Sequence, residues 1–181
     1  MSQPRILLFD SGMGGLTVAR SVRHELPFAH LVYSADNAAF PYGAWEEQAL
    51  VQRILFVMGR LIERVEPDIV VIACNTASTI ALPQLRERYK VPFVGTVPAI
   101  KPAAERTRSG LVSVLATPGT MRGTLLADVI REFADPAGVQ VLKAVSTELV
   151  PLVEAGQAVA AGERLAVLEA MKMEHALTAG R

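Results

Sequence analysis

Short runs of apolar residues alternate along the chain with longer stretches in which apolar residues recur every three or four positions. The short runs predict buried strands, which we place at residues 6–9, 31–34, 69–73, 92–95, 111–115 and 139–145. The longer stretches predict helices at residues 16–26, 45–65, 76–89 and 121–133, with a further helix beginning near residue 99. This alternation predicts an α/β protein with open parallel sheets and flanking helices.

Three of these segments have features that bear on their predicted structure. Residues 69–73 are mostly β-branched and uninterrupted, which is typical of a parallel strand buried on both faces. Residues 45–65 carry apolar side chains at spacings of three and four, which is typical of an amphipathic helix. Pro83 lies inside the helix predicted at 76–89 and weakens the prediction for its first half.

The character of the sequence changes near residue 156. Glycines separate short apolar stretches at residues 157–168 and 169–177, a pattern compatible with small antiparallel strands. The same residues are rich in Ala, Glu, Leu and Met, which favour helices. The pattern leaves both alternatives open for this tail.

The composition narrows the class of protein. The 181 residues are 51% hydrophobic and 20% charged, which allows a sizeable core. The 18 Lys and Arg residues balance 18 Asp and Glu residues, and this zero net charge argues against a nucleic-acid partner. No apolar run approaches the roughly 20 residues that span a bilayer, and the apolar run before Asp10 is too short for a secretory signal. We therefore expect a cytoplasmic protein without a membrane partner.

The first of three polar loops that follow predicted strands is residues 10–15, Asp-Ser-Gly-Met-Gly-Gly. Ligands of open α/β sheets bind beyond the carboxyl ends of the strands. The glycines allow close approach of the backbone, and the amides at a helix N-terminus favour a bound anion. That anion could be a carboxylate or a phosphate, although Asp10 would repel a phosphate. The alternative is a tight turn in which Asp10 or Ser11 caps the helix.

The second loop, residues 74–79, begins with Cys74, the only cysteine of the chain. The positive end of the following helix should lower the pKa of this thiol, and a thiolate can act as a base or a nucleophile. Asn75 and Thr76 offer donors and acceptors to a polar ligand. The alternative is an ordinary small buried cysteine. A single cysteine excludes an internal disulfide and a cysteine-based zinc cluster, and we expect no metal.

The third loop contains Asp36 and Asn37, followed by Phe-Pro-Tyr-Gly at residues 40–43. It is compatible with the wall of a pocket or with a structural turn. Thr117, after a later strand, has the same ambiguity, because its hydroxyl would either face a ligand or cap the next helix.

These loops resemble those of the glutamate racemase family. Five motifs in order carry the resemblance, at residues 9–18, 34–43, 73–79, 94–102 and 115–120. It covers about residues 5–156. The resemblance implies a cofactor-free enzyme with two α/β domains facing each other across a cleft. Its reaction would interconvert L- and D-glutamate for peptidoglycan synthesis in the cell wall.

The resemblance also divides the chain and assigns roles. Residues 1–97 would form a first domain without its returning C-terminal segment, and residues 98–156 part of a second domain. Cys74 would remove the α-proton of glutamate, Asp10 would tune that transfer, and Glu154 resembles the acidic residue that accompanies a second thiol. The residues expected to hold the substrate are Ser11, Tyr42, Gly43, Asn75, Thr76 and Thr117.

The chain departs from the family pattern because it has no second cysteine. One thiol can remove a proton and return it to the same face, but inversion needs acid and base groups on both faces. We therefore expect impaired racemisation; the alternative is a remnant that binds glutamate without turnover. A shortened second domain exposes apolar surface, which favours aggregation or a homo-oligomer.

The tail, residues 157–181, resembles part of a different family, the biotinyl carrier domains. The specific feature is Ala-Met-Lys-Met at residues 170–173. The resemblance implies biotin attached to Lys172 on a hairpin turn, in a chimera joined near residues 153–156. The alternative is that Lys172 is an ordinary charged residue on a helix or a frayed end.

Overall fold

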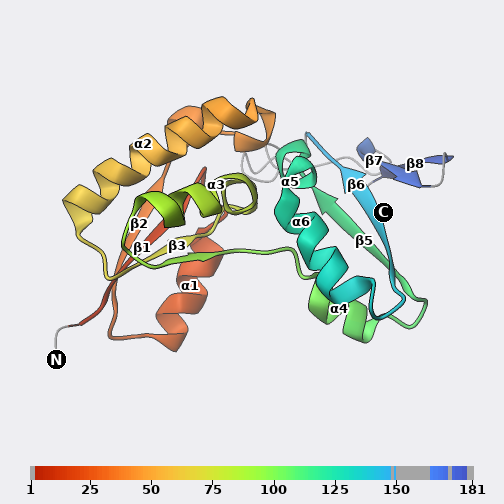
Figure 1. Ribbon diagram of the computed structural model, residues 1–181, viewed down its shortest axis with the longest axis horizontal. Coiled ribbons are helices and arrows are strands. Elements are labelled where there is room, and N and C mark those ends of the chain that lie inside the picture. Colours follow the sequence, from red (N-terminus) through yellow and green to blue (C-terminus); the bar gives the residue numbers. More distant parts are fainter. Residues whose placement is uncertain (1–2, 148, 150–163, 171–172, 179–181) are drawn as a thin grey trace. The chain divides into compact units, whose positions relative to one another are not determined.

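The computed structural model describes residues 3–147, 149, 164–170 and 173–178. The chain divides into two compact units, Met1–Thr96 and Val97–Arg181. Each unit contains a four-stranded sheet accompanied by helices (Figure 1). The α/β class predicted from the alternation of strands and helices is confirmed.

The first unit is built on a parallel sheet with the strand order β2-β1-β3-β4. The strands are β1 (Arg5–Asp10), β2 (His30–Ala35), β3 (Ile69–Ile72) and β4 (Phe93–Gly95). The helices are α1 (Leu16–Glu25), α2 (Glu47–Val65) and α3 (Asn75–Arg88), and two short 3-10 turns, η1 (Asn37–Ala39) and η2 (Tyr42–Ala44), precede α2. The prediction for this unit is therefore confirmed apart from small differences at element ends.

The two faces of this sheet are covered unequally. The face toward α2 and α3 holds the main core, which includes Leu7, Phe9, Val70 and Ile72. On the other face Leu8 is buried next to α1, although no residue of α1 is itself buried. Ile69 and Val71 lie on this second face and are only partly buried. The prediction that residues 69–73 are buried on both faces is therefore wrong for the side of the sheet next to α1.

The helices α2 and α3 are joined by a tyrosine that follows α3. Tyr89 donates its hydroxyl to the carbonyl of Leu55 on α2, at 2.7 Å. A Cβ on Gly59 would lie 2.8 Å from the same hydroxyl oxygen, so the glycine leaves room for it. Helix α3 continues through Pro83, although this proline weakened the helix prediction for the first half of the segment.

Strand β4 lies at the edge of the sheet. The carbonyl of Pro92 and the amide of Thr96 bond to β3, so the intervening carbonyl of Phe93 faces outward. It accepts a hydrogen bond from Nη2 of Arg86 on α3, at 3.1 Å. A charged side chain thus occupies part of the open edge.

The second unit has a mixed sheet with the order β5-β6-β7-β8. β5 (Leu111–Ala116) and β6 (Gln140–Val145) are parallel, whereas β7 (Arg164–Ala170) and β8 (Met173–Thr178) join in antiparallel pairs. The prediction of parallel pairing for the strands at residues 111–115 and 139–145 is therefore confirmed by β5 and β6. The backbone of the tail is extended at β7 and β8, as the strand alternative predicts.

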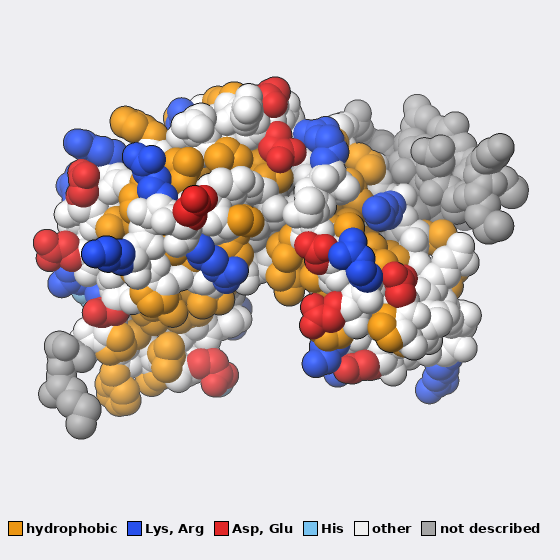
Figure 2. Space-filling model, in the orientation of Figure 1, with side chains coloured by type: hydrophobic (Ala, Val, Ile, Leu, Met, Phe, Trp, Pro, Cys, Tyr) orange, Lys and Arg blue, Asp and Glu red, His pale blue; other side chains and the backbone are white. Residues whose placement is uncertain are grey.

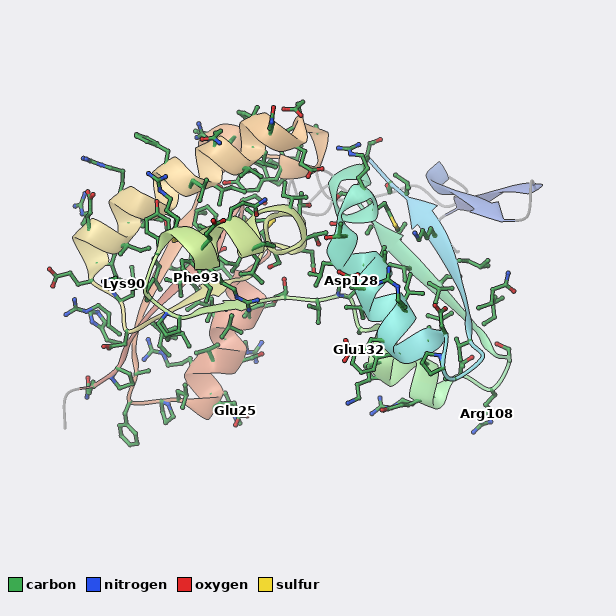
Figure 3. All side chains as sticks on the ribbon, in the orientation of Figure 1. Glu25, Lys90, Phe93, Arg108, Asp128 and Glu132 are labelled. Atoms are coloured by element: carbon green, nitrogen blue, oxygen red, sulfur yellow. The ribbon has the colours of Figure 1, made fainter. Side chains whose placement is uncertain are left out.

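The helices of this unit are short. They are α4 (Ile100–Arg106), α5 (Pro118–Arg122) and α6 (Thr124–Val129), which is followed by a π-helical turn at Ile130–Ala134. The single helix predicted at 121–133 is wrong, because Gly123 adopts an extended conformation (φ −68°, ψ 151°) that ends α5 and precedes α6. Arg108 projects from the turn between α4 and β5 (Figure 3).

Candidate active site

Polar loops of the first unit meet at one edge of its sheet. Strands β1, β2 and β3 are parallel, so the loops after their carboxyl ends share that edge. Asp36 donates its backbone N–H to the carbonyl of Asp10 at 2.9 Å, which ties the loop after β2 to the loop after β1. The loop after β3 begins at Cys74, whose Sγ lies 3.6 Å from Oγ of Ser11. Residues 63 positions apart in the chain are thereby in direct contact.

Cys74 is the N-cap residue of α3. Its backbone is extended (φ −73°, ψ 121°), and its Sγ accepts a hydrogen bond from the N–H of Ala77 at 3.5 Å. The residue is 8% exposed. Its sulfur nevertheless contacts polar groups of two loops, so it is not enclosed by hydrocarbon alone. This polar environment favours a role in binding or proton transfer over that of an ordinary core cysteine.

Asp10 turns its carboxylate toward the same place. Its Oδ1 accepts hydrogen bonds from Oγ of Ser11 and from the N–H of Gly12, both at 3.2 Å. The capping alternative for Asp10 or Ser11 is wrong, because Gly15 is the N-cap of α1 and makes no side-chain cap. A Cβ on Gly15 would lie 2.5 Å from Oδ2 of Asp10 and 2.9 Å from Cβ of Ala73. The glycine therefore permits the close approach of this turn to β1 and β3.

The electrostatics of Cys74 differ from the prediction. Burial raises the pKa of the thiol, and the negative charge of Asp10 raises it further. Hydrogen bonds from Ala77, Ser11 and Thr76 act in the opposite direction but do not compensate. The expected lowering of the pKa is therefore wrong, because removal of water from the sulfur outweighs the helix N-terminus. Cys74 is therefore protonated at neutral pH.

The loop after β2 contains a buried polar cluster. The hydroxyl of Tyr42, a predicted substrate-binding residue, donates to Oδ2 of Asp36 at 2.7 Å. Arg53 of α2 pairs with both carboxylate oxygens of Asp36, at 2.6 and 2.7 Å. Gly43 is buried beside Tyr42. Arg53 could not be found from the sequence, since no motif links it to Asp36, which lies 17 residues away in the chain.

The other predicted site residues fall in different places. Asn75 is exposed at the first turn of α3, and Thr76 is 4% exposed beside it. Thr117 belongs to the second unit, where its Oγ1 accepts from the N–H of Thr120 at 3.4 Å and caps α5. The capping alternative for Thr117 therefore describes the structure. Glu154 and Lys172 lie outside the described residues.

The part of the chain that the structure describes contains neither a metal-binding cluster nor a membrane-spanning helix. No cluster of three or more His, Cys, Asp or Glu side chains there is arranged to hold a metal ion. No helix within the same residues has the length and hydrophobicity needed to cross a bilayer.

The first unit therefore presents a buried thiol, a carboxylate and a hydroxyl at the strand ends of an α/β sheet. This combination is suited to moving a proton on a small polar ligand. The class of protein is thus an α/β protein whose first unit carries a buried thiol beside polar loops at the strand ends of its sheet. Comparison with known proteins makes this more specific.

The chain belongs to the Asp/Glu/hydantoin racemase family, which matches residues 16–177. The glutamate racemase of Brucella anthropi is 60% identical over 140 residues, which cover 77% of this chain and 50% of the relative. The glutamate racemase of Deinococcus radiodurans is 54% identical over 151 residues, covering 83% and 52%. The chain thus spans about half the length of the curated relatives it matches.

Solved structures of glutamate racemases are also similar to this chain. Escherichia coli glutamate racemase, in a complex with L-glutamate and the activator UDP-MurNAc-ala, matches with a TM-score of 0.78 and 45% identity, over 86% of this chain and 57% of that one. The glutamate racemase of Aquifex pyrophilus matches with a TM-score of 0.71 and 33% identity, over 84% and 59%. The family match extends through most of the tail, and no comparison supports a biotinyl segment there. Biotin on Lys172 remains a prediction from the sequence.

Proposed function

We propose that the first unit binds glutamate and that Cys74 exchanges its α-proton, as one half of a cofactor-independent racemase. The observation that carries this proposal is the contact between Cys74 and Ser11 beside the carboxylate of Asp10. Family membership and relatives named glutamate racemase support the choice of substrate. The structure of one relative is described as a complex with L-glutamate.

The proposed chemistry begins when Cys74 loses its proton to solvent as glutamate binds, which gives the thiolate. The thiolate removes the α-proton of glutamate, which leaves a neutral thiol and a planar carbanion. Because the pKa of the free thiol is raised, ionisation needs a nearby cation, and the ammonium group of the bound amino acid supplies one. Hydroxyl and amide donors around Ser11 and Thr76 would hold the carboxylates, and Asp10 would tune the proton transfer. The Cys74 thiol exchanges the captured proton with solvent, and delivery of a solvent proton, or a deuteron in heavy water, from Cys74 to the same face restores the starting enantiomer.

Inversion needs a proton donor on the opposite face of the carbanion. The sequence contains one cysteine, so no second thiol of this chain can serve. We therefore expect proton exchange with little inversion, which is the impaired activity that the sequence analysis predicts. A whole racemase of this kind would supply D-glutamate for peptidoglycan. Glu154 stays a prediction in that scheme.

The test is α-proton exchange in heavy water. L- and D-glutamate are each incubated with the chain in D2O, and deuterium at the α-carbon and the enantiomer ratio are measured by NMR and chiral chromatography. We expect deuterium in recovered glutamate of the original configuration. The control is Cys74→Ala, which should abolish the exchange. Equal exchange by both proteins, or none by the unaltered chain, would contradict the proposed proton transfer.

A second candidate is binding of glutamate without turnover. The observation that favours it is the raised pKa of Cys74, which leaves little thiolate at neutral pH. It predicts heat of binding in calorimetry but no deuterium in either enantiomer. The exchange experiment and calorimetry together decide between the two candidates.

A further inference from the structure

The turn at residues 11–15, between β1 and α1, is held by a side chain that the proposed proton transfer does not use. Tyr33 of β2 donates its hydroxyl to the carbonyl of Gly12 at 2.7 Å. Gly12 is buried, and a buried carbonyl needs a hydrogen-bond donor. The phenol of Tyr33 supplies one from a residue 21 positions further along the chain.

Tyr33 and Cys74 belong to opposite faces of the sheet. Tyr33 lies in register with Leu8 of β1 and packs in the hydrophobic cluster next to α1. Cys74 belongs to the main core, on the face toward α2 and α3. The turn at the strand ends is therefore fixed by Tyr33 from one face of the sheet and meets Cys74 on the other.

A short series of hydrogen bonds connects these two sides. The N–H of Gly12 and Oγ of Ser11 both donate to Oδ1 of Asp10, each at 3.2 Å. Oγ of Ser11 also lies 3.6 Å from Sγ of Cys74. Gly12 is thus anchored at its N–H by Asp10 and at its carbonyl by Tyr33. Because Ser11 directly precedes Gly12, a movement of Gly12 would shift the hydroxyl that contacts the sulfur.

Building on the proposed function, we propose that Tyr33 is a positioning residue for Cys74. By holding the Gly12 carbonyl, it keeps the Ser11 hydroxyl against the sulfur. A thiolate accepts hydrogen bonds and has no proton to donate, so Ser11 must be the donor of this pair once Cys74 has lost its proton. Without the Tyr33 hydroxyl, the Gly12 carbonyl would have to turn toward water or another donor, and the contact between Ser11 and Cys74 would lengthen. The thiolate would lose a donor and would form less readily.

A role for Tyr33 in stability alone makes a different prediction, and Tyr89→Phe is the matched control for it. Tyr89 also donates its hydroxyl to a backbone carbonyl, that of Leu55, at the same distance of 2.7 Å, and both bonds are partly buried. Tyr89 follows the end of α3 opposite to Cys74. If Tyr33 only stabilises the fold, both Tyr→Phe changes should lower the free energy of unfolding to a similar extent, and neither should alter the reactivity of Cys74.

The experiment measures the rate at which iodoacetamide alkylates Cys74, the single thiol, as a function of pH and without any ligand. The proteins are the unaltered chain, Tyr33→Phe, Ser11→Ala, the double variant of these two, and Tyr89→Phe. We expect Tyr33→Phe to raise the midpoint by up to about one pH unit, since the loss of one hydrogen bond corresponds to a shift of that order. In the Ser11→Ala background Tyr33→Phe should cause no further shift, because the hydroxyl that it positions is gone. Tyr89→Phe should leave the midpoint unchanged.

A second assay follows exchange of the α-proton of glutamate in heavy water. Tyr33→Phe should slow the exchange about fivefold, the factor that corresponds to one hydrogen bond of ordinary strength. Tyr89→Phe should not slow it. If circular dichroism shows that Tyr33→Phe does not fold, Tyr33→Met removes the same hydroxyl and decides in both assays.

An unchanged or lowered alkylation midpoint in the folded Tyr33 variant would overturn the inference alone. So would an equal shift in Tyr89→Phe, a full shift that persists in the Ser11→Ala background, or exchange as fast as in the unaltered chain. Absence of exchange by the unaltered chain would overturn the proposed function instead, while the alkylation assay, which needs no ligand, still decides whether Tyr33 acts on Cys74. The two failures are therefore distinguishable.

Discussion

At the scale of single residues, the environment of one sulfur governs the chemistry available to the chain. Cys74 is withdrawn from water and faces a carboxylate, and both conditions favour the neutral thiol. Donors from Ser11 and the first turn of α3 favour the thiolate but are weaker. The balance of these groups therefore favours the protonated form of Cys74 at neutral pH.

The first prediction concerns the pH dependence of Cys74 alkylation. The midpoint should lie above the value of about 8.5 that is usual for a free thiol. Asp10→Asn removes a negative charge and should move the midpoint down, whereas Ser11→Ala removes a stabilising donor and should move it up. The measurement is the rate of iodoacetamide labelling between neutral and strongly alkaline pH. Shifts of both variants in one direction would refute this account of the sulfur.

The same pKa shift links Cys74 to stability. The pKa of Cys74 is higher in the folded than in the unfolded chain. When the pH exceeds the pKa of the unfolded chain, the unfolded chain loses the thiol proton first, and this favours unfolding. The contribution to stability is fully present below about pH 8.5, the pKa usual for a free thiol, and is lost as the pH rises through the folded pKa. Burial and Asp36 raise the pKa of Tyr42 in the same sense, so both groups reduce stability in the alkaline range.

At the scale of secondary-structure elements, the packing of α2 on α3 depends on one phenol and one glycine. We expect Tyr89→Phe to lower the free energy of unfolding by about 1 kcal/mol, through loss of the hydrogen bond to Leu55. Gly59→Ala should gain up to about 1 kcal/mol of helix propensity, but its Cβ would crowd the Tyr89 hydroxyl. Gly59→Ala should therefore be more favourable in the Tyr89→Phe background.

Urea denaturation of the four proteins of this double-mutant cycle measures the coupling. An effect of Gly59→Ala that is identical in both backgrounds would show that the hydroxyl does not limit the space at position 59. The comparison isolates the steric contact, because only the Gly59→Ala single variant has both the added Cβ and the Tyr89 hydroxyl.

The elements of the first unit could be predicted because their periodicity agrees with their burial. β1 and β3 contain unbroken apolar runs that end just before Asp10 and Cys74. In α2 apolar residues recur every three or four positions from the start of the helix to its end. The break at Gly123 had a signal in the glycine itself, but the apolar spacing on either side concealed it. The antiparallel pairing of β6 with β7 depends on contacts across many residues, which no local pattern contains.

Part of the candidate site could also be predicted. The loops at Asp10 and Cys74 had to converge, because parallel strands end at a common edge. The depth of Cys74 below the surface could not be inferred, and so the sign of its pKa shift was wrong. The apolar spacing of α2 predicts which of its residues are buried, but it does not predict a partner for Arg53. The pairing of Arg53 with Asp36 depends on how α2 packs against the loop after β2.

At the scale of the whole molecule, apolar side chains remain open to solvent. Hydrophobic side chains reach the surface of the first unit near the end of α1 (Figure 2), where Leu26 and Phe28 are 49% and 79% exposed. Val94 of β4 is 47% exposed and lies in register with Val71, on the sheet face next to α1. Such a face favours association between copies of the chain.

The corresponding prediction is that Val94→Lys reduces self-association. A charge on an apolar edge strand opposes contact between copies, and a change at an exposed position should alter the free energy of unfolding by no more than about 0.5 kcal/mol. Sedimentation velocity at increasing concentration measures the association. Gln52→Lys, which adds the same charge at an exposed position of α2, is the control and should have no effect. Association unaffected by Val94→Lys would place the contact elsewhere.

The guanidinium of Arg86 on the Phe93 carbonyl restricts how such copies could join. Growth of the sheet by an incoming strand would require displacement of a permanent cation from the very carbonyl that the newcomer must bind. Addition of a strand from another copy to the edge of β4 is therefore disfavoured, whereas face-to-face packing of two sheets is not. Copies that associate through the β4 side of this unit should accordingly meet face to face and should not extend the sheet at β4.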